Sequence, residues 1–418
     1  LLTFLVIQSG HLLADKVLNQ PRAYYPIIAV APAIFFAGLM SVFRGYFQGH
    51  QWMMPTAVSQ VVEQLFRVSA VLLLAFLLFP RGLEFAAAGA TAGAVVGGAV
   101  GLLVLMGYYV YFNRKHSQPG AKLVYSDTSS REIAQEFIRL AIPVSFGAVV
   151  FPLVQVLDAI IVPGRLMAIN YTASQATALY GQLSGMAAVL ISLPTIFTIS
   201  IATSMVPAIS EAMARQDRPM LNSRLNYGLR AGMLISFPCA AGLYVLAFQI
   251  CDLLYAAPEA GIPLEPLAFS TIMLAAFQLS SAGLQGIGRP EIGMRNLVIT
   301  GALKVVFNYT LTSVPFLNIK GAAIGTVMAF LVGSLLNLLY LKKLTGMTYE
   351  NGRLAKIGLV TVLMAIGVKC SYQGIVGMDI NSHIATLLAI VVGVGIYGLL
   401  LLLLKELDMD MVKRLIKN

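Results

Sequence analysis

The residues best placed to do chemistry in this chain are the few ionisable side chains that interrupt long apolar runs. Glu63 and Arg67 stand four positions apart in the apolar run 56–79, so a helix would place them on one face. Asp158 and Lys304 interrupt two further apolar runs. Charged groups inside such segments are costly, and they usually face a cavity or a partner. They therefore predict either a binding path for a charged substrate or ion pairs inside the molecule.

Both interpretations remain open for these charges. Glu63 and Arg67 can simply neutralise each other, and that outcome is about as plausible from sequence as a role in binding. Asp158 and Lys304 lie on different predicted helices, so for them we expect a dual role, as an ion pair and as working residues. Asn308 stands four positions after Lys304 and would share its helix face.

Other chemistries find little support. Cys239, Cys251 and Cys370 are too few and too scattered for a disulfide framework or a metal site. The four histidines stand singly, so neither metal nor cofactor binding is expected. The acids between the apolar runs are separate, and the loops are short, so an enzyme such as a membrane glycosyltransferase is only a distant alternative.

The elements that carry these residues are predicted to be membrane-spanning helices. The chain is 58% hydrophobic and only 11% charged, and a soluble domain carries about twice that charged fraction. Runs of about 20 apolar residues are long enough to cross a bilayer as helices. The expected spans are 27–47, 56–79, 85–112, 136–162, 176–206, 225–250, 264–284, 292–314, 321–341, 355–371 and 384–404. Residues 1–14 resemble the end of one more span.

The distribution of cations predicts the orientation. Most of the 28 lysines and arginines fall in alternate connections, and positive charge marks the cytoplasmic side. The tail from Lys405 is therefore expected in the cytoplasm. The net charge of +10 follows from this bias and from attraction to anionic lipids, so no nucleic-acid partner is implied.

A stretch of sequence in which polar residues interrupt apolar ones occurs twice. Gln48-Gly49 in SVFRGYFQGHQWMMPTAVSQVVEQLFRV, from Ser41, corresponds to Gln285-Gly286 in the second copy, and Arg67 corresponds to Lys304. Each copy reads as a helix, a short turn with a basic residue, and a helix with a cation near its middle. Arg44 falls in the first of these predicted turns. Such a repeat indicates two related lobes around a substrate path.

These motifs resemble a known superfamily. RGYFQG at Arg44–Gly49, the segment that follows it, LAIPVSFGAVVFPLVQVLDAIIVPGRL and GALKVVFNYTL are similar to the polysaccharide-transporter and SpoVB-like branch of the MOP (MATE-like) superfamily, and within it to MurJ-type lipid II flippases. The resemblance implies an all-α integral membrane fold with two pseudo-symmetric six-helix lobes and two C-terminal helices.

On that plan the first two helices and part of the third would be missing from this sequence. Residues 1–112 would be the remainder of the N-lobe and 113–135 a cytoplasmic linker. The C-lobe would span 136–344, and 345–418 would hold the last two helices and the tail.

The resemblance also implies a function in the bacterial cell membrane. A monomer would move an undecaprenyl-diphosphate-linked precursor, lipid II above all, to the outer leaflet by alternating access, among membrane lipids and without a cofactor. Export of another lipid-linked glycan is the alternative, and a MATE-type drug antiporter is less expected, because it would need acids rather than cations. The residues expected to bind substrate are Arg67, Glu63, Gln182 and Arg44.

The residues expected to couple transport to an ion follow from the same resemblance. Some MurJ proteins have the pattern of a sodium carrier, and the matching positions here are Asp158, Lys304, Asn308 and Thr326. A lysine in this set supplies the positive charge that sodium would bring. We therefore expect Lys304 to take the place of the ion.

Overall fold

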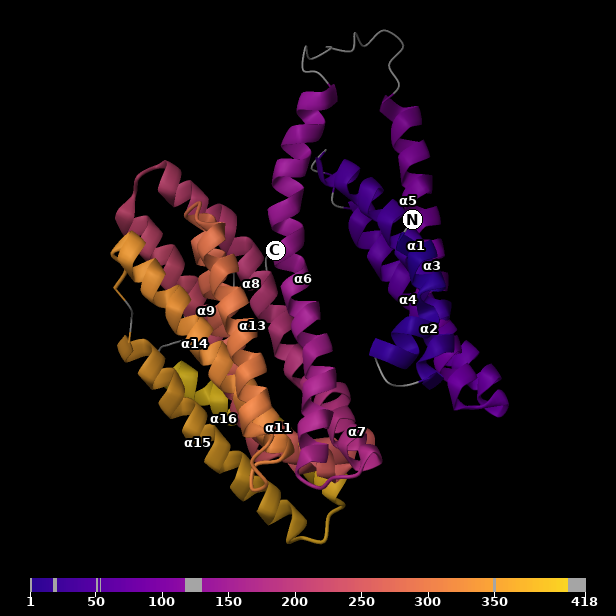
Figure 1. The fold of residues 1–418 in the computed structure, drawn as a ribbon. Helices are drawn as coiled ribbons and strands as arrows, with labels where there is room; N and C mark the ends of the chain where they lie inside the picture. The colour runs from indigo at the N-terminus through magenta and orange to yellow at the C-terminus, as the bar shows by residue number, and fades with distance from the viewer. Residues whose placement is uncertain are drawn as a thin grey trace. The chain divides into compact units, whose positions relative to one another are not determined.

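The chain is helical throughout the part that the structure describes. This computed structural model describes residues 2–17, 21–49, 52, 54–116, 130–348 and 351–404, and every regular element in them is a helix (Figure 1). Among these residues, eight helices are long and apolar enough to cross a membrane, or nine if one bent pair is taken as a single span. The predicted all-α membrane class is confirmed. The predicted linker and cytoplasmic tail fall largely outside the described residues.

The chain divides into two compact units, residues 1–128 and 129–418. The helices of unit 1 are α1 (Leu2–Gln8), α2 (Gly10–Leu12), the π-helix Leu13–Val17, the 3-10 helix Pro21–Ala23, α3 (Tyr24–Gly49), α4 (Met54–Leu78), the 3-10 helix Phe79–Arg81 and α5 (Leu83–His116). The division into lobes and C-terminal helices stays a prediction.

Close helix packing in unit 1 depends on a row of glycines in α5. Gly89, Gly93, Gly97 and Gly101 recur every fourth residue and so share one face of the helix. A Cβ at Gly97 would meet the backbone oxygen of Glu63 at 2.7 Å. Small residues of this kind let membrane helices approach closely. The row therefore brings α5 against the part of α4 that carries the charged residues.

Unit 2 contains the remaining helices. They are α6 (Ser130–Ala168), α7 (Ala173–Gly181), the π-helix η4 (Gln182–Ala187), α8 (Ala188–Ala214), α9 (Arg218–Val245), α10 (Ala247–Tyr255), the 3-10 helix Pro258–Ala260, α11 (Gly261–Leu267), α12 (Ser270–Gly286), α13 (Pro290–Leu311), α14 (Ile319–Thr345), α15 (Asn351–Val376) and α16 (Ser382–Leu403).

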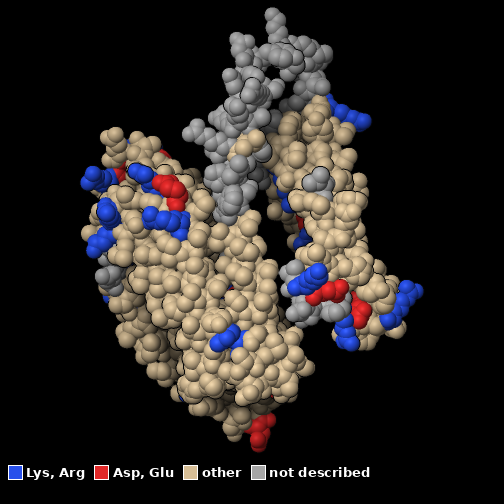
Figure 2. All heavy atoms as spheres, in the orientation of Figure 1, with Lys and Arg blue, Asp and Glu red and all other residues tan. Residues whose placement is uncertain are grey.

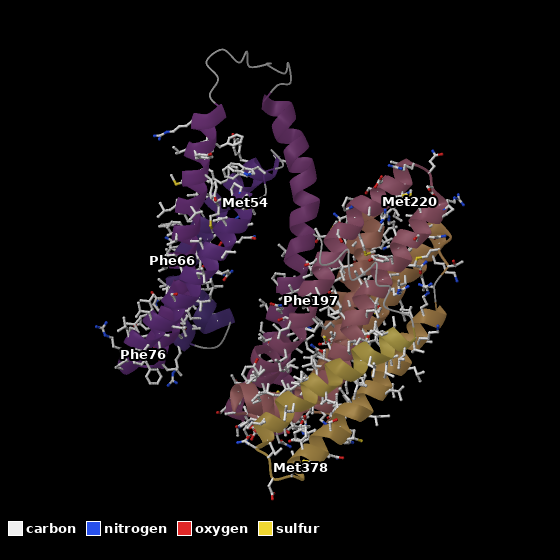
Figure 3. The ribbon with its side chains drawn as sticks, turned by 180° about the vertical axis from the view of Figure 1, so that it is seen from behind. Met54, Phe66, Phe76, Phe197, Met220 and Met378 are labelled. Atoms are coloured by element: carbon white, nitrogen blue, oxygen red, sulfur yellow. The ribbon has the colours of Figure 1, made fainter. Side chains whose placement is uncertain are left out.

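The core of unit 2 is concentrated near its two ends. One cluster surrounds the buried side chains of Leu246, Leu264 and Ile319, and the other surrounds Ile209 and Leu284. Met220 and Met378 mark the opposite ends of the unit in Figure 3. Most large side chains on the outer faces of both units are apolar and exposed, as a lipid environment requires.

Most of the charged side chains of unit 2 that are visible in Figure 2 gather at one end. On the face shown in Figure 2, most of its blue and red atoms lie at that end, above a wide band with almost none. Two ion pairs, Arg215 with Glu211 and Arg289 with Glu291, belong to the connections α8–α9 and α12–α13. These connections are two of those that the cation count places in the cytoplasm.

Three predicted boundaries were wrong in detail. The span 264–284 is broken, because α11 and α12 meet at a bend of 44°. The span 225–250 ends at Val245, and α10 begins two residues later. The turn expected from Arg44 is still helix, because α3 continues to Gly49.

Candidate functional site

The first cluster of charges surrounds Glu63 on α4. Its Oε2 accepts a hydrogen bond from Nη2 of Arg44 on α3 at 2.8 Å, and its Oε1 accepts one from Nη2 of Arg67, one turn further along α4. The Glu63 side chain is only 8% exposed. A buried carboxylate is stable there because both of its oxygens are paired with guanidinium groups.

This cluster carries more positive than negative charge. One carboxylate faces two arginines, so a formal charge of +1 remains near the middle of α4. The Arg67 side chain is 37% exposed, and its buried Nε has no hydrogen-bond partner among the described residues. Arg67 therefore keeps donor capacity that Glu63 does not use.

Arg44 belongs to this cluster for a reason that the sequence reading missed. A residue in a turn would lie at the membrane surface, whereas α3 carries Arg44 alongside α4. Its guanidinium also lies 3.4 Å from Oγ of Ser59, which is buried. Glu63 thus binds two cations, where the sequence predicted a pair with Arg67 alone.

The second cluster joins α6 and α13 in unit 2. Oδ2 of Asp158 is within hydrogen-bonding distance of Nζ of Lys304, and its Oδ1 accepts a 2.7 Å hydrogen bond from Nδ2 of Asn308. All three side chains are largely buried: Asp158 is 10% and Lys304 15% exposed. The spacing of four residues on α13 therefore directs both polar groups to one carboxylate.

Thr326 does not join this cluster by a hydrogen bond. Its hydroxyl donates to the backbone oxygen of Ala322, one turn earlier on α14. The neighbouring Gly325 lies close to the cluster: a Cβ at this position would meet Oδ1 of Asn308 at 2.5 Å. That oxygen is buried and has no donor among the described residues. Three of the four expected coupling residues are thus brought together.

Gln182 lies in unit 2 at the start of a π-helix. The segment Gln182–Ala187 widens the helix between α7 and α8, and such π segments often occur at functional sites. Gln182 is partly buried, and its Oε1 has no hydrogen-bond partner among the described residues. The side chain can therefore accept a hydrogen bond but supplies no charge.

Metal-binding geometry is not found in the part of the chain that the structure describes, where no three histidine, cysteine or acidic side chains stand together. Each acid of the two clusters is already paired with a cation. The chemistry that these clusters offer is hydrogen bonding and charge pairing between helices, and in unit 1 the two helices, α3 and α4, are candidate membrane spans.

Comparison with protein families identifies two matches. The model of the polysaccharide biosynthesis protein family matches residues 1–213, which is more than half of the chain. A second model, MatE, matches residues 165–310. Together they include both charge clusters and Gln182.

Two relatives from Bacillus subtilis (strain 168) match most of the chain. Stage V sporulation protein B is 28% identical over 404 residues, which cover 96% of this chain and 77% of the relative. Lipid II flippase MurJ is 28% identical over 415 residues, which cover 91% of this chain and 72% of the relative.

Solved structures with the same fold include a flippase and a drug transporter. Lipid II flippase MurJ in an inward closed conformation superposes with a TM-score of 0.69 at 15% identity, covering 96% of this chain and 79% of that one. An inward-facing multidrug resistance MATE transporter of the MOP superfamily gives 0.67 at 15% identity, covering 82% and 77%. At these identities the comparison shows the MOP fold.

Proposed function

Because the chain belongs to the polysaccharide biosynthesis protein family, we propose that it is a flippase that carries a lipid-linked glycan precursor across the cell membrane. It is a multi-pass membrane protein of the MOP superfamily. One of its relatives, the lipid II flippase MurJ of Bacillus subtilis, is by name a flippase and not an enzyme. We further propose that it acts as a monomer in the bacterial cell membrane, with its C-terminus in the cytoplasm.

The substrate we propose is lipid II, a polyprenyl diphosphate that carries a sugar–peptide head. Its diphosphate cannot enter hydrocarbon without paired charges. The cluster Arg44–Glu63–Arg67 is the observation that supports this substrate best, because it holds a surplus cation midway along a membrane-spanning helix. A guanidinium group binds phosphate oxygens in a planar, two-pronged manner, and Arg67 has unused donors for this.

A second substrate class is supported by the other close relative. Stage V sporulation protein B matches a larger share of this chain than the lipid II flippase does. Another polyprenyl-linked glycan, such as a sporulation, capsule or teichuronic acid precursor, would present the same diphosphate to Arg67. The two classes differ only in the glycan.

Complementation separates these alternatives. The full-length protein is expressed in cells depleted of their own lipid II flippase, and we expect growth to be restored. Arg67→Ala should abolish growth while the protein still accumulates in the membrane, and Arg67→Lys should restore it in part. Arg81→Ala, at an exposed arginine beyond the end of α4, is the matched control and should support normal growth.

The protein level must be measured with each variant. Removing one partner of a buried ion pair can itself cost about 3–5 kcal/mol of stability. Normal growth of the Arg67→Ala strain would show that Arg67 only neutralises Glu63. Failure of the wild-type protein to restore growth, at a normal level, would favour the other glycan precursors.

A further inference from the structure

Unit 2 contains a groove that neither charge cluster occupies. It lies between the second half of α8, the second half of α12 and the first half of α13, and has a volume of about 720 Å³. This is within the usual range of about 300–1,000 Å³ for small-molecule sites. None of its lining residues is charged, and its polar ones are Thr203, Gln278, Ser281 and Gln285. We call it the α8–α12–α13 groove.

Gln278 presents an oriented amide to this groove. Its Oε1 accepts a hydrogen bond of 2.6 Å from the hydroxyl of Thr198, which is fully buried on α8. Its NH₂ group has no acceptor among the described residues. The acceptor end of Gln278 is thus fixed by α8, and its two donors stay available.

Ser281 is held by a buried hydrogen-bond network. Its Oγ accepts a 2.8 Å hydrogen bond from Nδ2 of Asn337 on α14, and Oδ1 of Asn337 accepts one of 2.8 Å from Asn296 on α13. Both asparagines are fully buried. The hydroxyl hydrogen of Ser281 has no acceptor among the described residues. Buried networks of this kind fix the orientation of their members.

The network itself contains one more unused polar atom. Oδ1 of Asn296 is buried, and no described residue donates to it. Unpaired buried polar groups cost about 1–3 kcal/mol each, so they indicate a missing partner such as water or a ligand. Asn296 does not line the groove, so its free oxygen marks only room for a further donor, such as a water molecule, in the network behind Ser281.

The chemistry of the groove selects its ligand. Neutral donors held in place by neighbouring helices fit uncharged acceptors, such as the hydroxyl, ring and acetamido oxygens of a sugar. A phosphate would lack a cation here, and a hydrocarbon chain would leave the donors of Gln278 and Ser281 unpaired. The apolar walls, among them Met294 and Leu297, suit the C–H faces of a sugar ring.

We propose that the α8–α12–α13 groove is a carbohydrate subsite, which binds the uncharged sugar of the lipid-linked substrate through Gln278 and Ser281. This inference rests on the proposed function. It assigns glycan recognition to unit 2. The selectivity of the protein for one glycan over another would then depend on these two side chains.

Binding to two probes tests this subsite. The full-length protein in lipid nanodiscs is titrated with undecaprenyl diphosphate and with the same lipid carrying an N-acetylated sugar. For the double variant Gln278→Met/Ser281→Ala we expect about tenfold weaker binding of the sugar-bearing probe, or about 1.4 kcal/mol. Binding of the sugarless probe should stay unchanged.

The matched control is Gln373→Met/Ser204→Ala, at exposed positions of α15 and α8 outside the groove. It should bind both probes as the wild type does. Equal loss of both probes in the groove variant, or loss of neither, would overturn the subsite. Loss of the sugarless probe alone would make the groove a site for the lipid chain. If the wild type binds neither probe, the proposed function itself is wrong.

Discussion

Glu63 explains how two arginines can be kept inside a membrane-spanning part of unit 1. A cation in the middle of a membrane helix costs about 2.5–3.5 kcal/mol on insertion scales, and pairing reduces this cost. With one carboxylate for Arg44 and Arg67, the pairing is incomplete by one charge. An anionic substrate would complete it. A structural ion pair would need no second arginine, so the surplus charge favours a role in binding.

Asp158 and Lys304 allow a prediction about ion coupling. Lys304 occupies the place where a cation would otherwise neutralise Asp158, so we propose that transport needs no sodium. Replacing sodium by potassium at fixed membrane potential should leave lipid II translocation in cells unchanged. Asp158→Asn and Lys304→Met should each impair transport, because each leaves one buried charge or donor unpaired. Their combination should recover protein level but not full transport.

The control for this pair is Lys320→Met, which removes a half-exposed lysine paired with Glu265. We expect it to transport normally. A steep loss of translocation without sodium in the wild-type protein would show that Lys304 does not replace the ion.

The pH dependence of thiol labelling at Cys251 tests the packing around α10. It lies on α10, beyond the span Arg218–Val245, and is fully buried. Burial raises the pKa of its thiol to about 11. Maleimide reacts with the thiolate, so we expect Cys251 to label far more slowly at pH 7.5 in the folded protein than in the unfolded protein, and its labelling to increase as the pH rises toward 11.

Labelling is followed by mass spectrometry on the folded protein, with Cys239 replaced by alanine. Unfolding in detergent should speed the labelling of Cys251. Equal rates for Cys251 in the folded and the unfolded protein would contradict the described packing around α10.

At the scale of the helices, the glycine row of α5 is the feature most sensitive to substitution. We expect Gly97→Ala to lower the melting temperature, because its Cβ would meet backbone oxygen of Glu63 and Cβ of Arg67 below 3 Å. Overpacking of this kind costs about 1–3 kcal/mol. Gly107→Ala on the same helix has nothing within 4 Å and should be neutral or slightly stabilising. Thermal unfolding in detergent compares the two, and equal melting temperatures would be inconsistent with close α4–α5 packing.

The helices also show what could be predicted from sequence and what could not. Apolar length predicted most of the spans, since a bilayer demands about 20 apolar residues of any helix. The expected spans 136–162 and 292–314 form the helices α6 and α13, which are not among the eight candidate spans of the described residues. The bend between α11 and α12 and the π-helix at Gln182 were missed, because local composition does not encode how a backbone adjusts to its neighbours.

The candidate sites, too, were predicted only in part from the sequence. The cost of isolated charges predicted that Asp158 and Lys304 would meet. Arg44 was misplaced, because its block was interpreted as a turn, whereas α3 stays helical to Gly49. The α8–α12–α13 groove could not be predicted from the sequence, because glutamine and serine form no recognisable motif there. Only the packing of three helices brings them together.

At the scale of the whole molecule, the orientation in the membrane is open to direct measurement. Glu291 and Met378 are both exposed. Met378 lies at the end of unit 2 opposite Met220 in Figure 3, and Glu291 stands at the start of α13, beside a connection that the cation count predicts to be cytoplasmic. In a background without native cysteines, we expect Glu291→Cys to react with an impermeant thiol reagent only from the cytoplasmic side. Met378→Cys should react only from outside. The reverse pattern would invert the proposed orientation, and labelling of both from one side would contradict the fold of unit 2.

We propose above all that this chain moves a lipid-linked diphosphate with the help of Arg67. The most direct measurement uses proteoliposomes that hold fluorescent lipid II in both leaflets, with an external quencher that reports the accessible fraction over time. We expect the wild-type protein to make the inner pool accessible within minutes, the Arg81→Ala control to do the same, and Arg67→Ala to remain near the rate of protein-free liposomes. Equal rates for wild type and protein-free liposomes, under conditions in which the protein remains folded, would contradict lipid II as the substrate.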